Sequence, residues 1–431
     1  MKKYLSLFLC VVLLLGVFAA APAAFAADDA DGEPENDYPI PGQEFTYLTK
    51  NAYATSELED GVCYYARQSI TLTLDADRTC PVIYTEGNLT IKGTATLTCE
   101  ILYAEGSATL KSGVVVCPVM NNPPDDDTLL INGLRGIQGV SISGGSITCQ
   151  RISGSAEMVT VTGGEVHAGS IGAIFGYLQS GGIVEVNSIW GREGVYVSGG
   201  TLTVGRVEHD FSFEISFPMV ITEPSGAVYS EETGRFVDAA GKPLDRVTIS
   251  EVKVDLPFTD VQPNAWYQKP VAWAVYKGIT KGTDRTHFSP KDVCTRAQTV
   301  TFLWRASGCP APKTATCGFT DVAEDAWYRS AVLWAVETGV TKGTDKTHFS
   351  PDETCTRAQA LTFLWRSRGL KPTPYDLDSL VFQDVSPDAY YASAVSWGTR
   401  SRIVNGTGNG RFSPDAFCTR ADLVTFLYRA S

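Results

Sequence analysis

Two patterns of hydrophobic positions divide the chain. Between about residues 87 and 200, short alternating or β-branched runs follow glycine turns, as in "SITC", "EVHA", "IVEV" and "TLTV". Because side chains in a strand alternate between its two faces, these runs predict short strands with one buried face. From residue 258 onward, aromatic and aliphatic residues recur at helical spacing, in runs such as "VAWAV" and "TFLWR". The pattern predicts a β-rich part followed by a mainly helical part.

Glycine turns set the period of the β-rich part. Gly87 and Gly106 are followed by glycine pairs at 144–145, 163–164, 181–182 and 199–200. The steps are 18 or 19 residues, apart from one of 38 that we treat as two of 19, with "NNPPDDD" as an insertion between rungs. Regular short strands between glycine turns predict the stacked rungs of a β-solenoid, similar to a parallel β-helix.

Cysteines follow the same period at Cys80, Cys99 and Cys117. Two interpretations are open: an inward column of buried thiols, or disulfides between neighbouring rungs. Cys309 and Cys317, which flank the linker "PAPKTAT", are a stronger disulfide candidate in a secreted chain.

The first residues predict export. Lys2 and Lys3 precede an apolar run and a closing "AFA" at 24–26, the order of a secretory signal peptide. The predicted organisation is a signal peptide (1–26), an acidic, proline-containing linker (27–56), the solenoid (57–222), a hairpin segment (223–255) and three helical repeats (256–308, 317–370 and 380–431).

Charge limits the partners of the exported chain. The formal net charge is -13, and removal of the two signal-peptide lysines makes it more negative. Nucleic acid and anionic membrane surfaces are therefore excluded as expected partners. No later stretch reaches the roughly 20 apolar residues of a spanning helix, so no membrane insertion is expected.

Each helical repeat contains a capping box followed by an unexplained arginine. "TRAQ" at 295–298 and 356–359 and "TRAD" at 419–422 place a threonine cap before a helix. The arginines Arg296, Arg357 and Arg420 then occupy the first helical position, where the helix dipole disfavours a cation. Each needs an anion. It is either an internal carboxylate, such as Asp260, Asp321 or Asp384, or a ligand carboxylate or phosphate bound by exposed helix amides and the guanidinium.

The ordered motifs "FTDV", "WY", "AVxW", "KGTD", "FSP", "CTRAQ" and "TFLWR" resemble the surface-layer homology (SLH) domain in three tandem copies, over Phe258 to Ala430. The resemblance implies a three-pronged helical spindle. It also implies non-covalent binding to secondary cell-wall polysaccharide, an anionic and pyruvylated polymer of Gram-positive envelopes. The expected location is then the cell wall or S-layer on the cell surface.

The resemblance also implies the binding residues. The three arginines would contact the anionic sugar group, and the aspartates would bind sugar hydroxyls or orient an arginine. Trp266 and Trp327 would stack on a sugar face or pack between helices. Gly282, Gly343 and Gly406 would let the backbone approach the ligand or form the loop turn. The third copy departs from the pattern at Arg402, Gly408 and Asp422, so its groove is expected to be the weakest.

The function of the solenoid stays open. Its motifs give no catalytic residue, metal site or cofactor: only His167 and His209 lie outside the helical repeats, and Asp125 to Asp127 are interpreted as a solvated loop. We expect the solenoid to display a binding or spacer surface for an unknown ligand. The alternatives are a wall-attached polysaccharide lyase or hydrolase and a structural surface-layer component.

Overall fold

The computed structural model describes residues 43–118, 133–372 and 381–431. The predicted signal peptide and the aspartates at 125–127 lie outside these residues. The chain divides between Val252 and Lys253 into two compact units. Among the described residues, no helix combines the length and apolar character of a membrane span.

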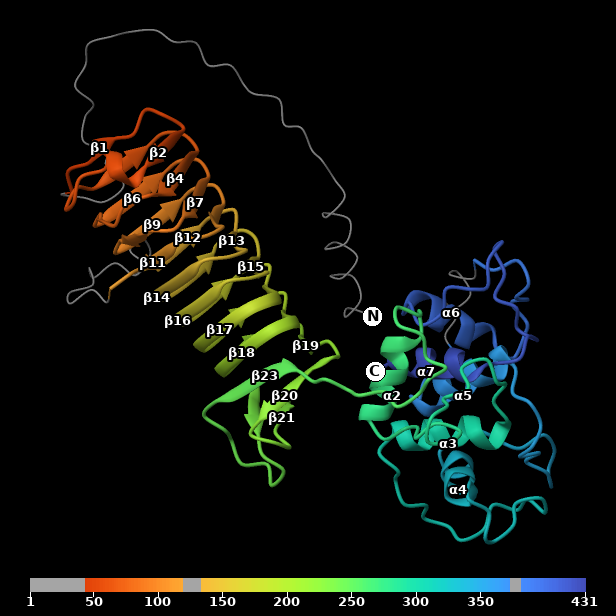
Figure 1. Cartoon of the computed structure of the whole chain (residues 1–431). Coiled ribbons are helices and arrows are strands. Elements are labelled where there is room, and N and C mark those ends of the chain that lie inside the picture. The colour runs from red at the N-terminus through yellow and green to blue at the C-terminus, as the bar shows by residue number, and fades with distance from the viewer. Residues whose placement is uncertain (1–42, 119–132, 373–380) are drawn as a thin grey trace. The chain divides into compact units, whose positions relative to one another are not determined.

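The first unit is the predicted β-solenoid, with parallel strands in three columns (Figure 1). The first column contains β2 (Ala52–Ala54), β4 (Ile70–Leu74), β7 (Leu89–Gly93), β10 (Ala108–Leu110), β13 (Val140–Ile142), β15 (Val159–Val161) and β19 (Phe213–Ile215). The second contains β5 (Arg78–Thr79), β8 (Thr96–Thr98) and β11 (Val114–Val116). The third contains β1 (Thr46–Tyr47), β3 (Tyr64–Ala66), β6 (Val82–Thr85), β9 (Ile101–Ala104) and β12 (Gly133–Gly136).

Longer strands join the columns in the later rungs. β14 (Ser146–Gly154) and β16 (Glu165–Ala173) run through the second and third columns. β17 (Tyr177–Gly191) and β18 (Val195–His209) run through all three. At the other end, the solenoid begins at β1, inside the segment that the sequence assigned to the linker, because Phe45, Leu48 and Tyr53 are buried there.

Glycines occupy two corners of the solenoid, so the single glycine series expected from the sequence is wrong. Gly87 and Gly106 lie between the third and first columns, whereas the glycine pairs lie between the first and second. Ala108 is in register with Val140, so the step of 38 residues holds one rung, with the extra residues in the connection from β11 to β12.

The solenoid core confirms the interpretation of the cysteines as buried thiols. Cys80, Cys99, Cys117 and also Cys149, which the sequence analysis did not include, are free and buried in one hydrophobic cluster. Ala168 and Val186 continue the column in later rungs. Burial raises the pKa of Cys149 to about 12, which keeps the thiol protonated and unreactive.

The predicted Cys309–Cys317 disulfide is absent, and both thiols are free. Other bonds fix the linker between them: Trp304 Nε1 donates to the Pro310 carbonyl (2.9 Å), and the Glu337 carboxylate accepts from the Lys313 N–H (3.0 Å). The linker is therefore held by helix side chains on each side.

A second cluster, which the sequence analysis missed, lies on the other face of the third column. Tyr65, Tyr84 and Tyr103 stack along successive rungs, with ring centroids 5.4 and 4.6 Å apart. Arg135 lies over Tyr103 in the next rung, 5.3 Å from the ring centroid. Stacked aromatic side chains in register stabilise successive rungs.

An antiparallel segment follows the last rungs. β23 (Val247–Glu251) pairs with β18 and with β20 (Met219–Glu223), and β21 (Val228–Ser230) forms a hairpin with β22 (Arg235–Val237). Phe236 of β22 is fully buried. The segment covers the second-column edge of β18, which would otherwise offer unpaired backbone groups.

The described part of the second unit contains α2 (Gln268–Tyr276), α3 (Arg296–Ala306), α4 (Arg329–Glu337), α5 (Arg357–Ser367), α6 (Ala392–Arg400) and α7 (Arg420–Arg429). Each repeat supplies two helices, but the packed pairs join different repeats: α3 with α4, α5 with α6, and α7 with α2. The second helices α3, α5 and α7 also contact one another. The first and last helices therefore close the unit into a ring.

Three backbone hydrogen bonds close the same ring. The N–H of Cys294 donates to the carbonyl of Cys418 (2.9 Å), Cys355 to Cys294 (2.9 Å), and Cys418 to Cys355 (2.8 Å). All three cysteines are fully buried. Each repeat is thus bonded to both others just ahead of its second helix.

Candidate functional site

The predicted capping boxes are present at the start of α3, α5 and α7. Thr295 Oγ1 accepts from the N–H of Gln298 at 3.2 Å, and Gln298 Oε1 accepts from the N–H of Thr295 at 3.1 Å. The same reciprocal bonds form in the other two repeats. Each cap fixes the following arginine as the first residue of its helix.

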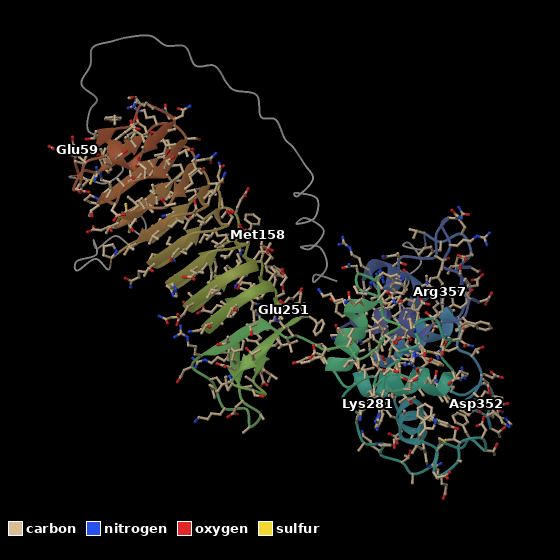
Figure 2. The ribbon with its side chains drawn as sticks, viewed as in Figure 1. Glu59, Met158, Glu251, Lys281, Asp352 and Arg357 are labelled. Carbon is tan, nitrogen blue, oxygen red and sulfur yellow. The ribbon has the colours of Figure 1, made fainter. Side chains whose placement is uncertain are left out.

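The three arginines are buried, with 3% of Arg296, 6% of Arg357 and 4% of Arg420 exposed. Each Nε donates to a phenylalanine carbonyl in the next repeat: Arg296 to Phe349 (2.9 Å), Arg357 to Phe412 (3.1 Å) and Arg420 to Phe288 (2.7 Å). Figure 2 labels Arg357 within the helical unit. The arginines thus connect the repeats in the same closed order as the helices.

Each guanidinium also lies between two aromatic rings. The carbon Cζ of Arg296 is 5.1 Å from the ring centroid of Phe349 and 5.4 Å from that of Phe363. Phe412 and Phe426 flank Arg357, and Phe288 and Phe302 flank Arg420. A cation over an aromatic face is stabilised by the ring quadrupole. We refer to a guanidinium with its carbonyl and two rings as an arginine pocket, named by its arginine.

The aspartates bind the backbone of the same phenylalanines whose carbonyls accept from the arginines. Asp260 accepts from the N–H groups of Phe288 (2.9 Å) and Ser289 (2.7 Å), and Asp321 and Asp384 repeat this arrangement. Ser289 has a φ of 57°, so the carboxylate holds a left-handed turn. Asp260 therefore orients Phe288, whose carbonyl accepts from Arg420; no ion pair of 4 Å or less joins these aspartates to the arginines in the described residues.

The helix amides do not form the exposed anion receptor that the sequence suggested. In α3, the N–H of Arg296 donates to the Glu353 carbonyl (2.9 Å), and that of Ala297 to the Pro351 carbonyl (3.0 Å). The next N–H is bound by the threonine cap. The guanidinium, rather than the backbone, is what remains for an anion.

The three pockets differ in charge pairing. Nη1 of Arg357 lies 3.2 Å from Oδ1 of Asp422. Nη2 of Arg296 and Nη2 of Arg420 are buried and, within the described part of the chain, have no hydrogen-bond partner. Burial lowers the pKa of both Arg296 and Arg420. Among the described residues, neither Arg296 nor Arg420 has a carboxylate within 4 Å. Glu353 and Asp321 act on Arg296, and Asp292 and Asp260 on Arg420, only from a longer distance.

The loop glycines are required by the turn itself. Gly282 has a φ of 89°, and an added Cβ would lie 2.5 Å from the His287 carbonyl oxygen and 2.6 Å from the Phe258 ring. Gly343 and Gly406 have the same environment, with φ values of 85° and 74°. Backbone of this kind is accessible to glycine and strained for other residues.

The predicted sugar-stacking residues are open to solvent. Trp266 is 59% and Trp327 63% exposed, and each contacts the following tyrosine edge to face. Tyr390, 60% exposed, holds the same place in the third repeat, although the sequence analysis did not select it. The hydroxyl of Tyr390 is among the groups that act electrostatically on Arg296, together with the carboxylates of Glu353 and Asp321.

Sequence reasoning also missed the phenylalanines of the pockets and the role of Asp422. The phenylalanines recur at fixed places in "FSP" and "TFL" of every repeat. That recurrence was the available signal, but it indicated core packing alone, because the carbonyl acceptor and its arginine belong to different repeats.

The S-layer homology domain family matches residues 257–300, 318–361 and 381–424. The chain carries three tandem S-layer homology domains. These SLH domains indicate a cell-surface location. Their match confirms the expectation drawn from the repeated motifs.

Relatives of low identity include a cell surface protein, an S-layer protein and an exoglucanase. A cell surface protein of Thermoanaerobacter kivui is 32% identical over 118 residues, covering 27% of this chain and 16% of the relative. The S-layer protein sap of Bacillus anthracis is 31% identical over 112 residues, 26% of this chain and 13% of the relative. Exoglucanase XynX of Acetivibrio thermocellus is 22% identical over 211 residues, covering 48% of this chain and 19% of the relative. The chain thus spans less than a fifth of the length of these relatives.

The loops of the SLH domains carry histidine–aspartate pairs in the first two copies. His287 Nδ1 lies 2.9 Å from Asp284 Oδ2, and His348 Nδ1 lies 3.0 Å from Asp345 Oδ2. The Thr347 N–H and the His348 ring lower the pKa of Asp345 to about 2. In the third copy, Gly408 takes the aspartate position and forms a local bridge to Arg411. The residues of the third copy that differ from the first two thus change the shape of this loop, but the Phe412 carbonyl still accepts from Arg357.

Outside the SLH domains, a polar cluster lies on the second column of the solenoid. Glu185 binds Arg246 (Nη2 to Oε1, 2.9 Å) and His167 (Nδ1 to Oε2, 3.3 Å). Arg246 also borders a hollow of about 470 Å³ with Thr203 and Glu223. Among the described residues, no group of three histidine, cysteine, aspartate or glutamate side chains could hold a metal ion.

Proposed function

We propose that the SLH module attaches the protein non-covalently to an anionic secondary cell-wall polysaccharide, with a pyruvate ketal as the anionic group. The observation that carries this proposal is the pair of buried arginines, Arg296 and Arg420, whose Nη2 atoms have no hydrogen-bond partner among the described residues, in a module with three exposed aromatic positions. Buried cations in proteins are normally paired. A carboxylate on a sugar supplies the missing charge, while an exposed ring stacks on the sugar face.

The repeat order assigns one exposed aromatic residue to each pocket. Tyr390 of the third copy acts on Arg296 of the first. Applied around the ring, the same order gives Trp266 to the Arg357 pocket and Trp327 to the Arg420 pocket. Each binding groove would then combine residues of all three SLH copies, and the closed ring is needed to form it.

The binding test uses the whole mature chain and purified cell-wall sacculi. Sedimentation with sacculi should be strong, and should disappear after acid extraction of the secondary polymer. Replacing Trp266, Trp327 and Tyr390 together by alanine should weaken binding at least tenfold without lowering the melting temperature, because all three are exposed. Trp190→Ala, at an exposed tryptophan of the solenoid, is the matched control. Binding that survives extraction would contradict the proposal.

For the solenoid we propose a display or spacer surface. Parallel strands in register expose long columns of side chains at regular spacing, an arrangement suited to an extended contact surface. The cluster of His167, Glu185 and Arg246 is the place to test the alternative, a polysaccharide lyase or hydrolase. Turnover of pectin, hyaluronan or wall glycans that is lost in Glu185→Gln would favour the enzyme. Ordered sheets formed by the purified protein would favour a structural surface-layer component.

A further inference from the structure

The three arginine pockets differ at one residue of the capping box. The second ring of each pocket is preceded, one helical turn earlier, by the last residue of that box: Gln359 before Phe363, Asp422 before Phe426, and Gln298 before Phe302. At this position the sequence has a neutral glutamine for the Arg296 and Arg420 pockets and a carboxylate for the Arg357 pocket. The difference in charge pairing follows this substitution.

Asp422 has the geometry for two roles. Its Oδ2 accepts from the N–H and the hydroxyl of Thr419, at 3.1 and 2.7 Å, and so caps α7. Its Oδ1 is thereby left for Nη1 of Arg357, at 3.2 Å. A glutamine caps with Oε1 and offers only an amide N–H as its second group, which does not accept from a guanidinium.

We propose that Asp422 is an internal anion that neutralises the Arg357 guanidinium, so that the module offers two sites for an anionic sugar, at Arg296 and Arg420. This inference rests on the proposed function and specifies its stoichiometry. A carboxylate tethered to the pocket competes with any external carboxylate at a high effective concentration. The proposal moves the expected weak site. Asp422 belongs to the third copy, but the arginine that it neutralises, Arg357, belongs to the second.

The stoichiometry is measured by isothermal titration calorimetry of the whole mature chain. The probe is a methyl glycoside that carries a pyruvate ketal, and the same glycoside without the ketal is the control. Wild type should bind two probe molecules per chain, and Asp422→Gln should bind three. The glutamine matches the other copies and retains the cap, so the melting temperature should stay within a few degrees.

The reverse substitution provides the matched control. Gln298→Asp places a carboxylate at the Arg420 pocket and should reduce the stoichiometry from two to one, and adding Asp422→Gln should restore two. The exposed rings give an independent readout: Trp327→Ala should weaken binding in wild type, whereas Trp266→Ala should weaken it only in Asp422→Gln.

Two kinds of failure are distinguishable. Three sites in wild type, or two sites in a folded Asp422→Gln protein, would overturn the role of Asp422 while leaving wall attachment intact. Absence of binding to both the ketal probe and the sacculi would overturn the proposed function and this inference together.

Discussion

Both units of the protein are built from repeats, but the repeats are joined in opposite ways. In the solenoid, each strand is in register with the strands of adjacent rungs, as Val166 is with Ile147 and Val184. In the SLH module, α7 packs against α2, and the arginine of the last repeat bonds the carbonyl of Phe288 in the first. The solenoid is a linear stack, whereas the module is a closed ring.

This difference predicts different cooperativity. Damage to one rung of a linear stack removes contacts with its neighbours only, so the loss of stability stays local. Damage to one repeat of the ring removes a partner from both other repeats. The module is therefore expected to unfold as one unit, although its sequence looks like three separate domains.

The largest effect is expected from Phe288→Ala in the module. The side chain is fully buried, forms one face of the Arg420 pocket and packs against Phe258. Removal of such a ring lowers the free energy of unfolding by about 3–5 kcal/mol. Calorimetry should show the transition of all three repeats moving together while the solenoid transition stays in place. Phe211→Ala, at an exposed solenoid position, should change neither. If α5 alone kept its protection from hydrogen exchange, the expectation that the three repeats unfold together would be wrong.

A smaller and local loss is expected from Gly164→Ala in the solenoid. Its φ of 81° is a left-handed conformation, and the added Cβ would lie 2.6 Å from the Gly145 carbonyl oxygen of the preceding rung. Backbone strain of this kind lowers the free energy of unfolding by about 1–3 kcal/mol. Hydrogen exchange should accelerate in the adjacent rungs and remain slow near β3. Gly226→Ala, where nothing lies within 4 Å of the added Cβ and φ is a similar 80°, separates the strain from the contact.

A pH-dependent effect of similar size is expected at Asp384. Burial alone would raise its pKa, but the N–H groups of Phe412 and Ser413 outweigh it, and the pKa lies below the ordinary value of 3.8. The carboxylate bonds thus stabilise the folded state above pH 4, and this contribution is lost as the pH falls through the lowered pKa. Asp384→Asn should lower the free energy of unfolding by about 1–3 kcal/mol at neutral pH and flatten the acid limb of the stability curve. The exposed Asp388→Asn is the control, and an equal effect there would refute the role of these bonds.

The smallest perturbation is thiol labelling, which follows the unfolding of each unit without a mutation. Cys309 is exposed and should react with iodoacetamide in the native protein. Cys294, Cys355 and Cys418 should become reactive together, at the transition of the module, because their backbone bonds form one ring. Cys99 and Cys117 should react at the solenoid transition. Mass spectrometry that finds Cys294 labelled well before Cys418 would show that the ring opens one repeat at a time.

Much of the fold could be predicted from the sequence. The glycine-bounded runs predicted stacked strands, and the "TRAQ" motifs predicted the three caps, because these patterns depend on residues close together in the chain. The predicted glycine series was wrong at the 38-residue step because Gly106 and Gly144 lie at different corners of the solenoid, and the sequence does not show which corner a glycine occupies. The expected Cys309–Cys317 disulfide is not formed, and nothing in the sequence indicated that Trp304 and Glu337, on two separate helices, bind the linker between these residues.

The sequence by itself determined the type and order of the repeats, their strands and helices, and the helix caps, since a cap joins residues only three positions apart. Only the tertiary structure decided what each arginine meets. The Nε bonds of Arg296 and Arg420 span 53 and 132 residues, and Asp422 reaches Arg357 from another repeat. Such contacts exist only after the ring has closed, because local periodicity carries no information about which distant repeat becomes the neighbour.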